Sequence, residues 1–69
     1  MIIEIGIVAG EIWHFLDEQG EVSLKDLTKS LADRTPENIL MSLGWLAREG
    51  HVILVKTNND YRISLRKDV

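Results

Sequence analysis

The stretch TPENILMSLGWLAREG, residues 35–50, has the signals of a helix at both of its ends. The hydroxyl of Thr35 can cap the first turn, and Pro36 suits the first helical position because no N–H is needed there. Gly50 can take the left-handed conformation that ends a helix. The pattern therefore predicts a helix from Pro36 to Glu49, around which the other elements can be arranged.

This helix has two unlike sides. Apolar residues recur at helical spacing and predict a stripe that faces the core, namely Ile39, Leu40, Leu43, Leu46 and Ala47. The residues predicted to face outward are Glu37, Asn38, Met41, Ser42, Trp45, Arg48 and Glu49. Function depends on what this outward side meets. Contact with DNA would indicate a regulator, and contact with protein would indicate an assembly module.

The length and composition favour one small intracellular domain over residues 1–69. A core this small is marginal alone, so we expect self-association to add buried apolar area. The chain has no cysteine, which excludes disulfides and thiolate metal sites. The apolar start carries Glu4 and Glu11 and lacks the basic segment of a signal peptide, and no apolar run is long enough to cross a bilayer. We therefore expect a cytoplasmic protein.

The charge is unevenly distributed along the chain. Residues 1–24 hold five acidic and no basic residues, a charge of −5, whereas residues 25–69 hold eight basic and six acidic residues, a charge of +2. The sum is the formal net charge of −3. This total argues against tight nonspecific binding to nucleic acid, although basic groups gathered on one face can still bind it.

A first helix is expected from about Ile3 to Gln19, before Gly20. Its β-branched start would also suit an extended strand, but the helical period continues to Leu16 and favours a helix. The residues of its core face are Ile5, Val8, Ala9, Ile12, Phe15 and Leu16. Ile3 and Ile7 lie on the other side, next to Gly6 and Gly10, where another backbone can approach. Two interpretations remain open: a helix buried on more than one side, or a homodimer contact.

The remaining elements follow from local signals. Ser23 can cap a second helix from Leu24 to about Leu31, and a short turn at 32–34 leads to the Thr35 cap. After Gly50, residues 51–57 and 61–66 predict two antiparallel strands, with a turn at 58–60. Val52 and Leu54 are expected to face the core, which leaves Ile53 and Val55 outward.

This order, together with the passage LAREGHVILV at 46–55, resembles the winged helix-turn-helix superfamily. GEVSLKDL and SLGWLAREGHV are also similar to a group of small stand-alone winged-helix proteins of bacteria and archaea with no established function. The fold class implied is α+β, with three helices, a short strand and a C-terminal two-stranded antiparallel wing.

The resemblance implies a role for each part of the chain. The third helix would lie in the major groove of DNA, the wing at 56–62 would touch the backbone or the minor groove, and the second helix with its turn would contact phosphates. The sequence departs from the usual base-reading pattern, because the outward side of the third helix offers only Asn38 and Ser42 as polar base readers. The carboxylates of Glu37 and Glu49 have the wrong sign to face phosphate.

Trp45 has three open interpretations. It can cover an edge of the core against the wing or the second helix, contact another protein such as a twin subunit, or stack on a base. The two apolar faces of residues 52–55 likewise indicate that something covers the outer face of the wing.

Enzymatic chemistry is not indicated. His14 and His51 lie on different elements with no cysteine near them, Asp17 and Glu18 point in different directions, and Gly6 and Gly10 lack the context of a dinucleotide fingerprint. We therefore expect no metal, no cofactor and no catalytic residue.

Two functions follow, and they can coexist. The first is a DNA-binding transcriptional regulator that acts as a homodimer on duplex DNA. Its predicted DNA contacts are Lys25, Lys29, Arg34, Asn38, Ser42, Lys56, Asn59 and Arg62. The second is a protein-interaction or dimerisation module on the same scaffold, without nucleic-acid binding. The predicted partner contacts are Ile3, Ile7, Trp45, Ile53 and Val55.

Overall fold

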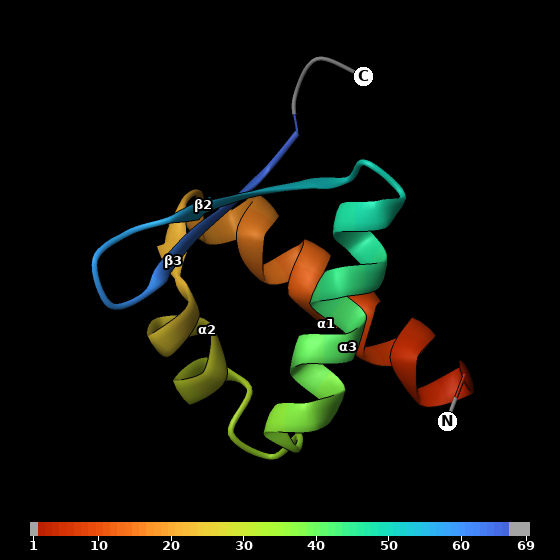
Figure 1. Cartoon of the computed structure of the whole chain (residues 1–69). Coiled ribbons are helices and arrows are strands. Elements are labelled where there is room, and N and C mark those ends of the chain that lie inside the picture. The colour runs from red at the N-terminus through yellow and green to blue at the C-terminus, as the bar shows by residue number, and fades with distance from the viewer. Residues whose placement is uncertain (1, 67–69) are drawn as a thin grey trace.

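The computed structural model describes residues 2–66, with only the backbone of Ile2. Helix α1 spans Ile2–Gln19, strand β1 spans Val22–Ser23 and helix α2 spans Leu24–Ser30. Helix α3 spans Pro36–Arg48, and the wing consists of β2, Val52–Lys56, and β3, Tyr61–Leu65. Figure 1 shows α1 behind α3, with the wing crossing one end of both helices and α2 at the left of the view, opposite α3 and on the same side of the wing. This is the α+β winged helix-turn-helix that the sequence predicted.

The expected caps are present. Thr35 accepts a hydrogen bond from the backbone N–H of Asn38 at 3.2 Å, and Pro36 is the first residue of α3. Ser23 caps the start of α2, because its side chain accepts a hydrogen bond from the backbone N–H of Asp26 at 3.0 Å. Gly20 and Gly50 follow α1 and α3 with φ of 77° and 80°, a conformation that an L side chain disfavours. The helix boundaries are therefore set by local backbone chemistry.

The sheet is antiparallel, with the order β1-β3-β2. Ile63 in β3 is paired with Val22 of β1 on one side and with Leu54 of β2 on the other. Because β1 directly precedes α2, this pairing attaches the helix-turn-helix to the wing. Among the described strands, β2 has a neighbour on one side only, so its other edge is unpaired.

The core lies where α1 packs on α3 and on the sheet. Its buried apolar residues come from every element: Val8, Ala9, Ile12, Leu16, Val22, Leu27, Ile39, Leu43, Leu46, Val52 and Ile63. Phe15, Leu24, Leu31, Ala47 and Leu65 are partly buried against it. The core face predicted for the first helix is thus confirmed at Val8, Ala9, Ile12, Phe15 and Leu16.

Three sequence expectations about facing are wrong. Leu40 was expected in the core and is 52% exposed, and Leu54 was expected there and is 40% exposed. Ser42 was expected on the outward side, yet it is fully buried. For the two residues of α3 the reason is the rotation of the helix: its buried ridge runs through Ile39, Ser42, Leu43 and Leu46, which turns Leu40 towards solvent. Leu54 lies in β2 and is exposed because it lines a surface hollow together with Leu40.

Candidate nucleic-acid interface

The face formed by α2, α3 and the wing is the candidate interface, because it carries the predicted helix-turn-helix. The backbone N–H of Lys25 lies 3.4 Å from Oδ2 of Asp60, which joins the start of α2 to the turn of the wing. Lys56 Nζ lies 5.0 Å from the centre of the Tyr61 ring, a cation–π distance. Lys25 and Lys56 therefore stand on neighbouring elements at one side of this face.

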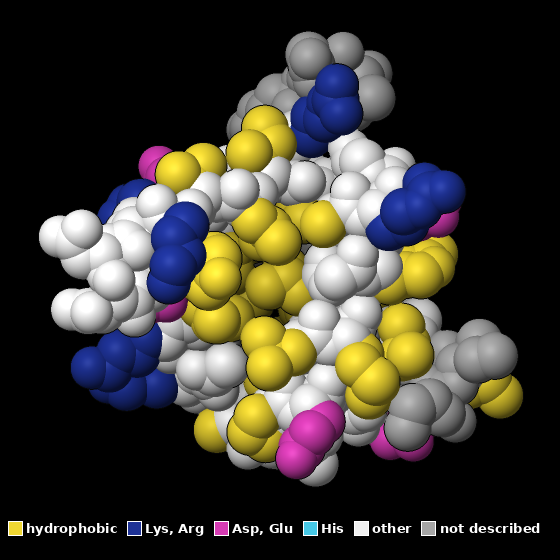
Figure 2. Space-filling view, in the orientation of Figure 1, with side chains coloured by type: hydrophobic (Ala, Val, Ile, Leu, Met, Phe, Trp, Pro, Cys, Tyr) yellow, Lys and Arg dark blue, Asp and Glu magenta, His cyan; other side chains and the backbone are white. Residues whose placement is uncertain are grey.

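The cations on this face lie around an apolar centre. Figure 2 shows Lys and Arg side chains at the edge of the view and hydrophobic side chains around a central hollow. Lys25, Lys29, Lys56 and Asn59 are exposed, and within residues 2–66 the three lysines take part in no ion pair. Their exposure leaves them accessible, and their contact with phosphate stays a prediction.

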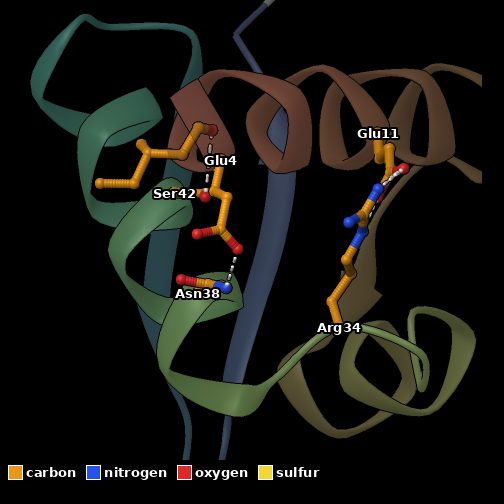
Figure 3. Close-up of polar contacts among 6 residues, drawn as sticks. Glu4, Glu11, Arg34, Asn38 and Ser42 are labelled. Atoms are coloured by element: carbon orange, nitrogen blue, oxygen red, sulfur yellow. Dashed lines mark hydrogen bonds and ion pairs between the residues drawn. The ribbon is translucent and has the colours of Figure 1, made fainter. Parts of the chain in front are cut away.

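Arg34 and Arg62 are already engaged. The Nε and Nη2 of Arg34 lie 2.9 and 2.6 Å from the two carboxylate oxygens of Glu11, as Figure 3 shows. The hydrogen bonds from Arg34 hold the pKa of Glu11 below its ordinary value. Arg62 Nε lies 2.8 Å from Oε2 of Glu21. Each arginine would have to share or exchange an acidic partner before it contacted a phosphate.

Neither of the predicted base readers points away from the protein. Ser42 donates its hydroxyl hydrogen bond to the backbone carbonyl of Ile5 at 3.1 Å, between α3 and α1. Asn38 is half-buried and donates from Nδ2 to Oε2 of Glu4 at 3.2 Å. Both side chains point towards α1 (Figure 3), so they fasten two helices together. Ser42 is therefore corrected from a base reader to a packing residue.

The exposed side of α3 is mainly apolar. Its exposed residues are Pro36, Glu37, Leu40, Met41, Gly44, Trp45 and Arg48. Arg48 is the one cation among them, and Glu37 is the one acid. Base readout normally uses Arg, Lys, Asn, Gln, Ser or Thr. This helix therefore offers little direct readout, and the basic groups beside it can serve as phosphate contacts.

An apolar hollow that the sequence analysis missed lies in the centre of this face. We call it the wing groove. It has a volume of about 270 Å³ and is lined by Leu24, Leu40, Leu43, Gly44, Leu54 and Tyr61. The yellow hollow of Figure 2 shows it open to solvent. The sequence does carry a signal for this hollow, because α3 and β2 have more apolar residues than one core-facing stripe on each can bury.

The predicted partner contacts Ile3, Ile7, Trp45, Ile53 and Val55 are all exposed. Trp45 lines a second hollow, between α1 and α3, which we call the α1 groove. Its volume is about 280 Å³ and its lining residues are Gly6, Ala9, Gly10, Trp13, Trp45, Leu46 and His51. Ile53 and Val55 alternate with the buried Val52 and so lie on the outer face of β2.

Within residues 2–66, no group of three or more His, Cys, Asp or Glu side chains is placed to hold a metal ion. None of the described helices combines the length and the apolar character that crossing a bilayer requires.

The fold and the face described above define a winged helix-turn-helix protein. Comparison with known families agrees: residues 2–65 match the winged helix-turn-helix domain DUF2582, and the chain belongs to this family. It is 40% identical over 65 residues to "Uncharacterized protein MJ1608" of Methanocaldococcus jannaschii, an alignment that covers 91% of each chain. No solved structure gives a significant match.

Proposed function

We propose that this protein is a cytoplasmic DNA-binding regulator, folded as a single domain, that contacts duplex DNA mainly through phosphates and acts as a homodimer. The supporting observation is the gathering of exposed lysines of α2 and the wing on the face that also carries α3 (Figure 2). Four of the five acids of segment 1–24 lie on α1, which borders the other hollow of α3 and not the wing groove. The two signs of charge meet at the edge of this face, where Glu11 and Glu21 pair with Arg34 and Arg62.

The residues assigned to phosphate are Lys25, Lys29 and Lys56, with Asn59 at the turn of the wing. Arg34 and Arg62 join them only if DNA displaces Glu11 and Glu21. Asn38 reaches a base only if it leaves Glu4. Binding dominated by phosphates is weak in sequence preference and steep in its salt dependence.

A salt titration tests this proposal. Duplex affinity is measured by fluorescence anisotropy between about 50 and 200 mM salt, and each phosphate contact contributes about −0.9 to the slope of log K against log salt. We expect Lys25→Gln, Lys29→Gln and Lys56→Gln each to weaken binding and to reduce the slope by about 1. Glu18→Gln, which changes the net charge by one unit on α1, is the matched control and should leave the slope unchanged. A flat salt dependence, or equal and opposite effects of Glu18→Gln and the lysine variants, would exclude the assigned face.

The wing groove supports a second candidate function, a protein-interaction module. An apolar hollow with cations on several of its sides fits an acidic amphipathic helix, whose apolar residues enter the groove while its acids pair with the cations. The probe is a model helix with Leu at positions i, i+3, i+4 and i+7 and Glu elsewhere. If this function holds, amide resonances of Leu40, Gly44 and Leu54 shift on titration, and Leu40→Glu abolishes the shifts. Saturable duplex binding that shifts the lysines of α2 instead would favour the first function.

A further inference from the structure

The α1 groove and the apolar side chains beside it form an exposed surface that the core does not use. Ile3 is 78% exposed and Ile7 is 51% exposed, and both lie on the outer side of α1. Trp13 and Trp45 line the groove and are 37% and 48% exposed. Large apolar side chains gathered in this way mark a contact surface more often than isolated exposed ones do.

The floor of this groove has no internal reason to be glycine. Gly6 and Gly10 lie inside α1, and the left-handed glycines of the described chain are Gly20 and Gly50 only. A Cβ at Gly6 or Gly10 would meet no atom within 4 Å in the described part of the chain. Each glycine costs a helix interior about 0.5–1 kcal/mol relative to alanine. A close approach by another molecule would explain why alanine is absent from both positions.

The exposed area is sufficient for a dimer. Together, Ile3, Ile7, Trp13 and Trp45 expose on the order of 450 Å² per protomer. This area follows from their exposed fractions, on a scale where a fully exposed aromatic side chain has about 250 Å². Homodimer interfaces are about 65% apolar, so this corresponds to an interface of about 1,400 Å² over both partners. That value lies within the range of about 1,200–2,000 Å² that stable specific interfaces bury.

The surface is also complementary to itself, as a two-fold contact requires. The apolar projections Ile3 and Ile7 are on the same helix as the glycine floor, so two antiparallel copies of α1 can each place an isoleucine over the other's glycines. Residues 5–10, IGIVAG, carry no charge. Glu4 is bonded to Asn38 and Glu11 is paired with Arg34, which turns both acids towards their own protomer. Like charges therefore do not oppose this contact at its centre.

We propose that a second copy of this chain occupies the α1 groove. The two copies of α1 pack against each other across a two-fold axis, and Gly6, Ile7 and Gly10 of each copy lie at the contact. The inference rests on the homodimer of the proposed function and names its contact surface. It leaves the α2–α3–wing face of both protomers uncovered, so the two sites are separate.

Sedimentation velocity without DNA tests the proposal, over a concentration range that spans micromolar to millimolar. We expect the wild type to dimerise and Ile7→Asp to remain monomeric throughout; because Ile7 is half-exposed, this variant keeps its fold, which circular dichroism checks. Gly10→Ala is expected to raise the dimer dissociation constant at least tenfold. Gly44→Ala is its matched control, since Gly44 lies inside α3 with the same open space around it and lines the wing groove.

Three results would overturn the inference: a wild type that stays monomeric at every concentration, an Ile7→Asp variant that dimerises as the wild type does, or a Gly10→Ala variant that dimerises as tightly as Gly44→Ala. The salt titration of duplex binding is independent of these results. A dimer through α1 that binds no DNA would keep this inference and remove the regulator. A monomer with salt-dependent DNA binding would remove this inference, together with the homodimer of the proposed function, and would keep the phosphate contacts.

Discussion

The two grooves on either side of α3 are nearly equal in size and differ in what surrounds them. The wing groove is lined by leucines, Gly44 and Tyr61 from α2, α3 and the wing, and Lys and Arg side chains lie to the left, above and to the right of it in Figure 2. The α1 groove has a glycine floor between two tryptophans, and no lysine or arginine lines it. Their volumes alone do not distinguish the two grooves. The difference in charge and in floor indicates that the first suits an anionic partner and the second suits a close apolar backbone.

Helix α3 is the wall that both grooves share. It contributes Leu40, Leu43 and Gly44 to the wing groove, and Trp45 and Leu46 to the α1 groove. Its buried ridge is narrow, and apolar residues continue beyond the ridge on both sides. A helix with one core stripe and one polar face would leave neither groove.

The largest effect expected from this comparison separates two leucines of the same groove. Leu43 is 4% exposed and Leu40 is 52% exposed, although both line the wing groove. Leu43→Ala should lower the free energy of unfolding by about 2–5 kcal/mol, because it leaves a cavity in the core. Leu40→Ala should cost less than about 1 kcal/mol, since its side chain is half in water already. Urea denaturation measures both, and equal losses would show that the wing groove closes over Leu40 in solution.

A smaller effect is expected at the contact that joins the two helices of the α1 groove. Ser42→Ala removes the hydrogen bond to the carbonyl of Ile5 and should lower the free energy of unfolding by about 1 kcal/mol. Duplex affinity should not change, because the hydroxyl is buried. Ser30→Ala at the exposed end of α2 is the control, with an expected change within about 0.5 kcal/mol. A loss of DNA binding by Ser42→Ala without a loss of stability would restore Ser42 as a base reader.

The smallest expected effect is a loss of stability at low pH. It arises at the ion pair of Arg34 with Glu11, which holds the α2–α3 turn against α1. The pKa of Glu11 in the folded protein is lowered from 4.5 by the hydrogen bonds from Arg34. Its contribution to stability is therefore complete above pH 4.5 and is lost as the pH falls through the lower folded pKa. The wild type should thus be more stable than Glu11→Gln at pH 6, and the difference should shrink as the pH falls below 4.5. Because about a third of each side chain in the pair is exposed, solvent screens the interaction and the difference is small.

Thermal unfolding of both proteins across this pH range checks the result, with Arg34→Gln as the partner control. If Arg34→Gln shows the same pH dependence as the wild type, the lowered pKa of Glu11 has another cause.

Much of the fold could be predicted because its signals are local. Thr35, Pro36 and Gly50 bound α3 through their own hydroxyl, ring and φ, and the alternation in β3 needs no distant partner. The rotation of α3 could not be predicted in the same way. Apolar residues cover a wide arc of this helix, so its period leaves the centre of the buried side open, and the burial of Ser42 depends on a carbonyl in α1.

The candidate interface was predictable only in part, for a related reason. The lysines of α2 and the wing remain exposed, and their positions follow from the order of the elements. The arginines do not, because Arg34 and Arg62 find acids 23 and 41 positions away in the chain. Single positions in a sequence show which side chains carry charge, and the tertiary fold decides which of those charges are already neutralised.

The distribution of aromatic residues has a practical consequence. Both tryptophans of the chain border the α1 groove, and its only tyrosine borders the wing groove. An unlabelled sample therefore shows the two sides in separate parts of a proton spectrum, as two indole N–H signals and one phenol ring system. An occupant of either hollow can be located by which of these signals moves.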